Sequence, residues 1–389
     1  MQEMGFSGYR RENGRVGVRN FVGIFSTVAC ANQLTHQIAS KVKGCIPFTH
    51  AHGCGQVKSD LKVVEEILVN LIMNPNIGAA MIVGIGCEGV QASKVYEKIA
   101  HITQKPIEYI VLMDEGGYKK ATQIGVKKAK YLFDKISNQK KEWQPLSELV
   151  IGIKCGASDT TSGLISNPLV GKVADLLVDQ GATVIFGEVT EFIGAEHFLA
   201  KRMKTEEARM KLLAAVDDIE RRIILTGEDI RGGQPSEGNI RGGISTLEEK
   251  SLGAINKSGH RFINGFLQYG QVPPSNGLFA MDFPGREPEA LTALAAAGSQ
   301  MIIFTTGLGA PQGFPFVPII KVTGNENTVL KMRSHIDYYE SFLSSEKDSE
   351  IGANTLLRKI IRVADGEKTK SEKLGFFEPT NIWIKGPVI

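Results

Sequence analysis

The sequence predicts an α/β protein with two domains, each a parallel sheet covered by helices on both faces. Apolar, β-rich runs alternate with helical patterns up to residue 137, and a second alternating series begins at residue 149. Strands that alternate with helices of this length indicate βαβ units and therefore parallel sheets. A chain of 389 residues is also long enough to bury more than one core.

The first domain is expected over residues 8–140. Its predicted elements are strand 20–27, helix 32–42, strand 45–48, helix 58–73, strand 79–83, helix 91–102, strand 107–113 and helix 117–137. The strands are apolar runs, and the helices repeat their apolar residues at helical spacing. Residues 138–148 are polar and contain Pro145, which predicts a linker.

The second domain is expected over residues 146–389. Its predicted elements are strand 149–153, helix 168–179, strand 182–186, helix 205–226, strand 278–281, helix 288–297, strand 301–305 and strand 317–322. Residues 227–245 are rich in Gly, Arg, Pro, Ser and Asn and show little periodicity. A polar segment of that length indicates either a functional loop or a mobile one.

Composition narrows the class of protein. The net charge of +3 is close to balanced, and the lysines between residues 119 and 141 have the spacing of a solvent-facing helix side rather than of a nucleic-acid patch. The start of the chain has no secretory pattern, and no apolar run reaches the ~18 residues of a membrane helix. Five scattered cysteines do not resemble a disulfide framework. We therefore expect a cytoplasmic protein that binds neither nucleic acid nor membranes.

Four of the five cysteines lie in turns with glycine or polar neighbours: Cys30, Cys54, Cys87 and Cys155. Cys87 and Cys155 directly follow predicted strands. In an open α/β sheet, ligands bind at the carboxyl ends of the strands. A thiol placed there, with glycine allowing close approach, favours a metal site over a packing role.

His50, His52 and Cys54 alternate, so their side chains would share one face of an extended segment. Imidazole and thiolate both suit iron or zinc. The alternative is a polar turn that packs two neutral histidines. Together with Cys87 and Cys155, Cys54 would supply three thiolates and leave an open position. A mononuclear Fe²⁺ or an iron–sulfur cluster with one accessible iron would both fit.

Charged residues next to strand ends are further candidates. Glu188 follows the strand that ends at residue 186, and Lys154 stands beside Cys155. Lys154 could act as a base or bind an anion, or it could simply leave the strand end toward water. Asp159 could be a ligand or a base, but an N-cap of the following helix explains it equally well.

Cations and amides in or beside the glycine-rich segment suit an acidic, hydroxyl-bearing substrate. They are Arg241, Lys250, Asn256 and Lys257. The run 305–312, which contains Thr306 and Gly307, ends a strand with small residues whose backbone N–H groups suit an anion. No Walker loop, dinucleotide fingerprint or serine-hydrolase elbow is present, which argues against ATP, NAD or serine chemistry.

Several of these motifs together resemble the altronate/galactarate dehydratase family. The resemblance rests on Tyr-Arg-Arg-Glu-Asn-Gly-Arg-Val-Gly-Val-Arg-Asn at 9–20, on the turns around Cys54, Cys87 and Cys155, and on segments 188–196, 243–253, 256–259 and 305–313. It covers residues 8–389. A sister branch is similar to the large subunit of sulfolactate sulfo-lyase, which eliminates sulfite from a related 2-hydroxy acid.

The resemblance implies a cytoplasmic lyase that removes water from a sugar acid with Fe²⁺ or another divalent metal such as Mn²⁺. It also implies a domain boundary near residue 140. Single-chain members carry a small domain before the motif at 9–20, and this chain starts at that motif. The chain therefore resembles the large subunit of a split enzyme, with a separate small subunit as partner, and a homo-oligomer is expected.

The resulting hypothesis assigns roles to the candidate residues. Iron would be held by Cys54, Cys87 and Cys155, with His50 or His52 as a further ligand or an acid. Lys154 or Lys250 would be the base, assisted by Glu188, and the substrate would be bound by Arg241, Asn256, Lys257, Thr306 and Gly307. Two alternatives stay open: a non-catalytic sugar-acid-binding subunit, and a redox or iron–sulfur scaffold protein.

Overall fold

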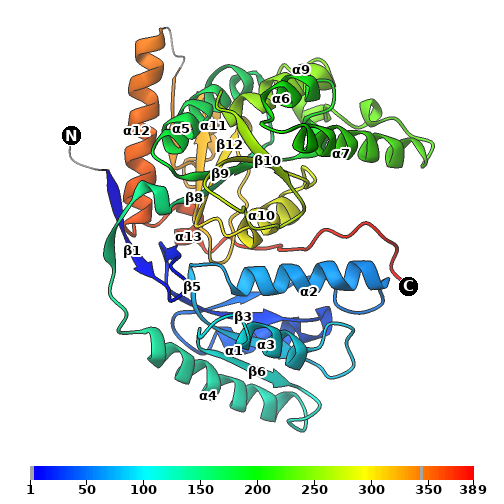
Figure 1. The fold of residues 1–389 in the computed structure, drawn as a ribbon, viewed down its shortest axis with the longest axis vertical. Coiled ribbons are helices and arrows are strands. Elements are labelled where there is room, and N and C mark those ends of the chain that lie inside the picture. Colours follow the sequence, from blue (N-terminus) through cyan, green and yellow to red (C-terminus); the bar gives the residue numbers. More distant parts are fainter. Residues whose placement is uncertain (1–3, 342–344) are drawn as a thin grey trace.

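The computed structural model describes residues 4–341 and 345–389 and confirms the predicted fold class. Two fully parallel sheets, of four and seven strands, lie one above the other and are accompanied by a small antiparallel sheet (Figure 1). Within the described residues, no helix is both long enough and apolar enough to span a membrane.

The four-stranded sheet belongs to the first half of the chain and has the order β4-β3-β5-β6. Its strands are β3 (Phe21–Ser26), β4 (Cys45–Phe48), β5 (Ile77–Gly84) and β6 (Ile107–Val111). Its helices are α1 (Asn32–Ala39), α2 (Lys58–Ile72), α3 (Ala92–Ala100) and α4 (Tyr118–Ile136). Helices α1 and α4 share a core on one face, while α2 and α3 cover the other.

The seven-stranded sheet has the order β10-β11-β9-β8-β12-β13-β14. Its strands are β8 (Val150–Gly156), β9 (Thr183–Phe186), β10 (Ile263–Leu267), β11 (Gly277–Met281), β12 (Met301–Thr306), β13 (Ile319–Thr323) and β14 (Tyr338–Tyr339). One face packs on α5 (Asn167–Asp179), α7 (Glu206–Ile224) and α12 (Glu346–Ala364). The other face packs on α10 (Glu287–Ala296).

Both parallel sheets reverse their direction of growth once. In the smaller sheet the chain leaves β3 for β4 on one side and then continues with β5 and β6 on the other. In the larger sheet β9, β11 and β10 lie on one side of β8, and β12 and β13 lie on the other. Loops that leave such a switch point in opposite directions open a crevice at the carboxyl ends of the strands, where ligands bind. The fold therefore offers two such crevices.

The polar stretch 138–148 is more than the linker that the sequence predicted. Strand β7 (Glu142–Pro145) lies in it and pairs with β1 (Gly5–Arg10), which also pairs with β2 (Val16–Gly17). These short strands have no alternating apolar pattern, so their pairing could not be seen in the sequence. The sequence also gave no prediction for β10, for α12, for α8 (Glu237–Arg241) within the glycine-rich segment, or for α9 (Leu247–Ile255) directly after it.

The two sheets are joined through helices and through buried amides. Helices α2 and α10 pack between the sheets (Figure 1) and contribute to one continuous apolar core. Asn76 lies in this region with no exposed surface. Its Oδ1 accepts hydrogen bonds from the backbone N–H groups of Val18 and Arg19, and its Nδ2 donates to the carbonyls of Gln300 and Phe316, at 2.8–3.2 Å. One side chain thus joins three segments that are distant in sequence.

Replacement of Asn76 by Ala should lower the free energy of unfolding by about 2–4 kcal/mol, because it leaves several buried backbone groups without partners. Chemical denaturation followed by circular dichroism measures this change. Asn138→Ala, at an exposed position, is the control and should stay within about 0.5 kcal/mol of the unsubstituted protein. Equal effects of the two substitutions would contradict the bridging role.

Candidate active site

The carboxyl end of β8, at the switch point of the larger sheet, carries a buried group of charged side chains. Lys154 and Cys155 are the last side chains of this strand before Gly156. Two residues beside them, Ala157 (φ 50°) and Glu188 (φ 76°), are the non-glycine residues with positive φ in the described chain. Such backbone conformations cost free energy and concentrate at functional sites. They indicate that the side-chain positions at this site are maintained at the cost of local backbone strain.

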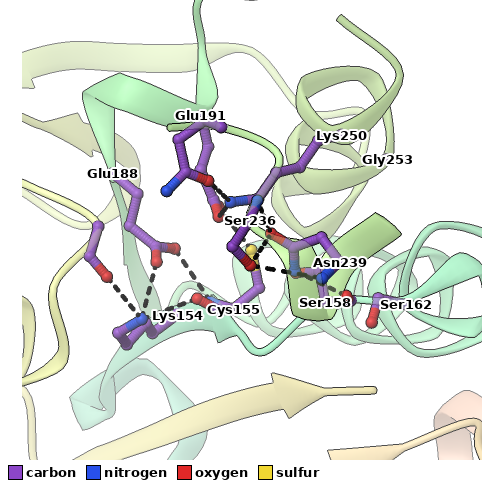
Figure 2. Close-up of polar contacts among 12 residues, drawn as sticks. Lys154, Cys155, Ser158, Ser162, Glu188, Glu191, Ser236, Asn239, Lys250 and Gly253 are labelled. Atoms are coloured by element: carbon purple, nitrogen blue, oxygen red, sulfur yellow. Dashed lines mark hydrogen bonds and ion pairs between the residues drawn. The ribbon is translucent and has the colours of Figure 1, made fainter. Parts of the chain in front are cut away.

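Lys154 is completely buried, and its ammonium group is saturated with acceptors (Figure 2). Its Nζ donates to Glu188 Oε1 at 3.0 Å, to the Cys155 carbonyl at 2.8 Å and to the Gly285 carbonyl at 3.1 Å. Burial disfavours the charged form, but the carboxylates of Glu188 and Glu287 outweigh it, so the pKa of Lys154 is raised above its usual value. The group is therefore a protonated structural cation.

Lys257 occupies the other side of the same cluster. Its Nζ lies 2.9 Å from Cys155 Sγ and 3.2 Å from Glu191 Oε2, and it forms a further ion pair with Glu188. Burial again opposes ionisation, but Cys155 and the two carboxylates raise the pKa of Lys257 well above its usual value. The sequence placed Lys257 on a loop as a clamp for substrate carboxylates. In the structure it has no exposed surface and clamps the protein's own carboxylates.

The carboxylates of Glu188 and Glu191 come from the loop after β9. Glu188 Oε2 accepts a hydrogen bond from the Cys155 backbone N–H at 3.0 Å. Burial alone would raise the pKa of Glu191, but the neighbouring lysines, Lys257 first, overcome this and lower it. Glu191 is thus ionised at neutral pH, and its Oε1 lies 3.6 Å from Lys250 Nζ.

Cys155 stands between these charges with its thiol protonated. Its Sγ donates to Glu191 Oε2 at 2.8 Å. Burial, followed by the negative charges of Glu188 and Glu191, raises the pKa of Cys155 well above its usual value. Because the thiolate is the nucleophilic form of cysteine, this thiol is poorly suited to nucleophilic attack.

The Cys155 thiol and the carboxylates of Glu188 and Glu191 could hold a metal ion. Their ligand atoms lie within 4.8 Å of one another, and no other such group of three exists among the His, Cys, Asp and Glu residues of 4–341 and 345–389. One thiol and two carboxylates would accept Fe²⁺ or Mn²⁺. However, the ammonium of Lys257 already contacts all three groups. A metal ion would have to displace a buried lysine, so the donor set fits a lysine better than a metal.

A cavity of about 510 Å³ opens beside this buried cluster. Its walls include Cys155 and Glu191 from the cluster, together with Lys250, Arg286 and Glu287. Lys250 is the lysine of the site that reaches the cavity, and it also lines a second, adjacent cavity of about 260 Å³. Its Nζ donates to Gln234 at 2.7 Å. The cavity wall thus combines two basic side chains, Lys250 and Arg286, with the carboxylates of Glu191 and Glu287.

The other predicted substrate-binding residues lie outside the larger cavity. Asn256 lines the smaller one. Arg241 is exposed on α8, where it pairs with Glu237 at 3.5 Å. Thr306 is buried, and its Oγ1 accepts from the backbone N–H groups of Gly309 and Ala310. Gly307 is also buried and packs directly against Asp159, where a Cβ atom would meet the carboxyl group at 2.2 Å. Thr306 and Gly307 therefore support the loop that follows β12.

The predicted ligands from the first domain are not brought together with Cys155. Cys54 and Cys87 are exposed, and neither belongs to the close ligand group described above. His50 is buried and has both ring nitrogens engaged: Nε2–H donates to the Ser26 carbonyl at 2.9 Å, and Nδ1 accepts from the His52 backbone N–H at 3.1 Å. His52 keeps its buried Nε2 without a hydrogen-bond partner among the described residues.

Two residues of the site, Glu191 and Arg286, are absent from the sequence-predicted set. Glu191 lies five residues after the end of β9, farther from the strand end than Glu188. Arg286 was missed because it follows an apolar strand through the turn Asp282–Gly285. The available indication was the same for both residues, namely a charge in the loop after a predicted strand of a parallel sheet.

The parallel α/β fold therefore carries a buried lysine–carboxylate cluster beside a cavity at the carboxyl end of β8. Sequence comparison gives the family. The "D-galactarate dehydratase/Altronate hydrolase, second domain" model matches residues 8–137, and the "D-galactarate/Altronate dehydratase, C-terminal" model matches residues 146–388. The chain belongs to the galactarate/altronate dehydratase family.

Three curated relatives represent different named activities. Altronate dehydratase of Bacillus subtilis is 35% identical over 384 residues, which cover 96% of this chain and 76% of the relative. The beta subunit of (2R)-sulfolactate sulfo-lyase of Chromohalobacter salexigens is 36% identical over 376 residues, 96% of each chain. Galactarate dehydratase (L-threo-forming) of Escherichia coli is 32% identical over 405 residues, 98% of this chain and 77% of the relative.

Replacement of Lys257 by Met should lower the free energy of unfolding by about 3–5 kcal/mol, because it leaves buried carboxylates without their partner. The matched control is Lys211→Met, which removes an exposed lysine paired with Glu207 and should cost less than about 1 kcal/mol. Urea denaturation measures both values. A loss for Lys257→Met no larger than that of the control would show that the cluster is not held by its charges.

The protein should lose stability as the pH falls from about 6.5 toward 4. Burial lowers the pKa of His50 to about 4, whereas an unfolded histidine titrates near pH ~6.5. The unfolded state therefore binds the extra proton first, which costs up to about 3 kcal/mol at the low end of this range. Unfolding curves across this pH range, compared with those of His50→Gln, measure the contribution. An identical pH slope in the variant would exclude His50 as its source.

Proposed function

We propose that this protein dehydrates a sugar acid, an altronate-type aldonate or a galactarate-type aldarate, to a 2-keto-3-deoxy acid. The observation that carries the proposal is the cavity beside the Lys154–Glu188–Lys257–Glu191 cluster, in a chain about a third identical to two dehydratases. The cavity presents a lysine and an arginine to an acid. Glu191 of the buried cluster contacts Lys250, and Lys154 donates to the carbonyl of Gly285, next to Arg286.

The chemistry requires two events at neighbouring carbons. A base removes the proton alpha to the carboxylate, and the 3-hydroxyl leaves as water to give an enol that becomes the keto acid. The proton alpha to a carboxylate is weakly acidic, so cations near that carboxylate must stabilise the charge that develops there. A positioned base supplies about 10²–10⁴-fold of the rate.

Lys250 is the proposed base. Lys154 is fully buried and protonated, and every direction from its Nζ is filled by acceptors of the protein. Lys250 has a side chain 12% exposed and lines the cavity directly. Glu191 and Gln234 hold its Nζ from the protein side. These contacts orient the amine toward the space that a substrate would fill.

Arg286 is the proposed clamp for the substrate carboxylate, in the role that the sequence gave to Arg241. Arg286 lines the cavity, and its Nη1 lies 2.7 Å from Glu289 Oε1. A guanidinium held on one side by a carboxylate keeps its remaining N–H donors free for bidentate contact with an acid. Asn256, which lines the adjacent cavity, would contact the hydroxyl groups of a longer sugar acid.

A second candidate reaction is elimination of sulfite from sulfolactate. The sulfo-lyase relative matches this chain over 96% of both lengths, whereas the matched residues cover 76% of the altronate dehydratase from Bacillus subtilis. The alpha-proton is removed in the same way, and only the leaving group differs. Because that relative is named a beta subunit, we also propose that a separate small subunit completes the enzyme.

Lys250→Met and Lys250→Arg should both lower kcat/KM by about 10²–10⁴-fold, because neither side chain can accept the proton at neutral pH. A keto-acid assay and a sulfite assay over altronate, galactarate and sulfolactate, with the small partner present, measure turnover and name the substrate. Arg241→Ala is the control and should leave turnover nearly unchanged.

Substantial activity in Lys250→Arg would show that Lys250 only binds an anion and is not the base. No turnover of any of the three acids by the complete enzyme would overturn the proposed function.

A further inference from the structure

Three of the five cysteines gather at the second crevice of the fold, at the carboxyl edge of the smaller sheet. Cys30 follows β3, Cys54 follows β4 and Cys87 follows β5. These three strands are neighbours in the order β4-β3-β5, and β3 and β5 flank the switch point of this sheet. All three thiols are exposed. By contrast, Cys45 begins β4 and therefore lies at the opposite edge.

Direct backbone contacts hold the three cysteine loops together. The N–H of Ala29, next to Cys30, donates to the His52 carbonyl at 2.9 Å. The N–H of Gly89 donates to the carbonyl of Gly53, next to Cys54, also at 2.9 Å. The loops after β3 and β5 meet where the N–H of Thr27 donates to Val83 at 3.0 Å. Each pair of loops is thus joined within a few residues of its cysteines.

Glycine makes this close approach possible. Gly53 has φ +102°, and a Cβ atom on it would lie 2.1 Å from the Thr27 carbonyl oxygen. The carboxylate of Glu88, beside Cys87, accepts from the N–H groups of Ile85 and Gly86 at 3.1 and 2.6 Å and fixes the turn. The exposed thiols therefore stand on loops that are tightly held rather than loose.

Each cysteine shortly precedes a helix: Cys30 precedes α1, Cys54 precedes α2 and Cys87 precedes α3. The N-terminus of a helix carries a partial positive charge that suits an anionic group. A cluster held by three cysteine ligands is such a group, because the complex of cluster and ligands carries a net negative charge.

We propose that Cys30, Cys54 and Cys87 bind an iron–sulfur cluster. Clusters are held by cysteine thiolates, and three thiolates would hold three irons of a four-iron cluster and leave the fourth without a protein ligand. A single ion needs ligand atoms at tetrahedral spacing, and no close ligand group of the described residues contains these thiols. A cluster can be held by thiolates that lie farther apart, because its own iron and sulfide atoms lie between them. The proposed site thus contains Cys30 where the sequence hypothesis had Cys155.

The open iron would serve the reaction as a Lewis acid, and this part of the inference rests on the proposed function. A short series of contacts links the cysteine loops to the cavity. Arg286, at the cavity, pairs with Glu289, which accepts from Asn381 at 3.0 Å. Asn381 in turn accepts from the N–H of Ala51 at 3.4 Å. Three contacts thus connect Arg286, at the cavity, with the loop after β4 that carries Cys54.

Cluster transfer to the apoprotein under anaerobic conditions tests the proposal. The probe is a preassembled four-iron, four-sulfide cluster that carries small thiolate ligands. Three protein thiols replace three of these ligands, and each gives its proton to the thiolate that leaves, so no oxidant or reductant is needed. The expected product contains about four irons and about four sulfides per chain and absorbs in the visible range. Alkylation with mass spectrometry should show Cys30, Cys54 and Cys87 protected after transfer.

Single Cys→Ser substitutions locate the site. Cys30→Ser, Cys54→Ser and Cys87→Ser should each lose most of the iron and sulfide, while Cys45→Ser and Cys155→Ser should retain both. Circular dichroism checks that each variant is folded, and Cys→Ala variants replace any that is not. Retention in all three exposed variants, or equal loss in Cys155→Ser, would overturn the proposal, as would failure of the unsubstituted chain to take up the cluster.

These measurements need no substrate, so they are independent of the lyase assay. A chain that binds the cluster through the three cysteines but turns over none of the acids would support the site and refute the proposed function. A chain that turns over an acid without binding the cluster would do the reverse.

Discussion

The mutual neutralisation of two buried lysines and two buried carboxylates is the constraint on which the site depends. Lys154, Lys257 and Glu188 have no exposed surface, and Glu191 has little. Removing any one of these charges from water is costly, and the cost is recovered only where an opposite charge and further hydrogen bonds are in place. The ends of β8, β9 and α9 are therefore fixed relative to one another.

This neutralisation also determines which charges remain for a ligand. Lys154 and Lys257 are opposed by the carboxylates of Glu188 and Glu191, and Glu287, 3.6 Å from Lys154, adds a third carboxylate. The Cys155 thiol adds no charge, because burial keeps it protonated. Lys154 and Lys257 are thus fully occupied by the protein's own carboxylates. Lys250 and Arg286 are the basic side chains in the cavity wall that can contact an acid.

The sequence predicted the fold closely where elements have strong periodicity. The strand 45–48 and the helix over 58–73 match β4 and α2 within one residue, because a β-rich run and a long amphipathic pattern have few alternatives. The short strands β1, β2 and β7 could not be predicted in this way. Their pairing depends on long-range contacts, such as that of Phe6 with Gln144, and not on a local pattern.

The sequence predicted which loops form the candidate site, but it did not predict which side chains contact one another there. Lys154, Cys155, Glu188, Lys250 and Lys257 were all named from their positions near strand ends or in the glycine-rich segment, and the structure brings them together. The sequence could not show that Lys257 would be buried among carboxylates. The sequence placed Cys54 and Cys87 in the first domain and Cys155 in the second, but it could not show whether the two sheet edges meet. That arrangement depends on how the domains pack, and no local pattern records it.

The carboxyl edges of the two sheets differ in their chemistry. In the larger sheet, lysines occupy the position among the carboxylates that a metal ion would otherwise fill, so this edge is suited to proton transfer and anion binding. In the smaller sheet, exposed thiols stand at helix N-termini with no lysine paired to them in the described residues, so this edge is suited to a soft metal. The proposed elimination would use both functions on adjacent carbons. The shared apolar core and the contact of Asn381 with the loop after β4 fix the two edges relative to each other, so neither edge can move independently of the other.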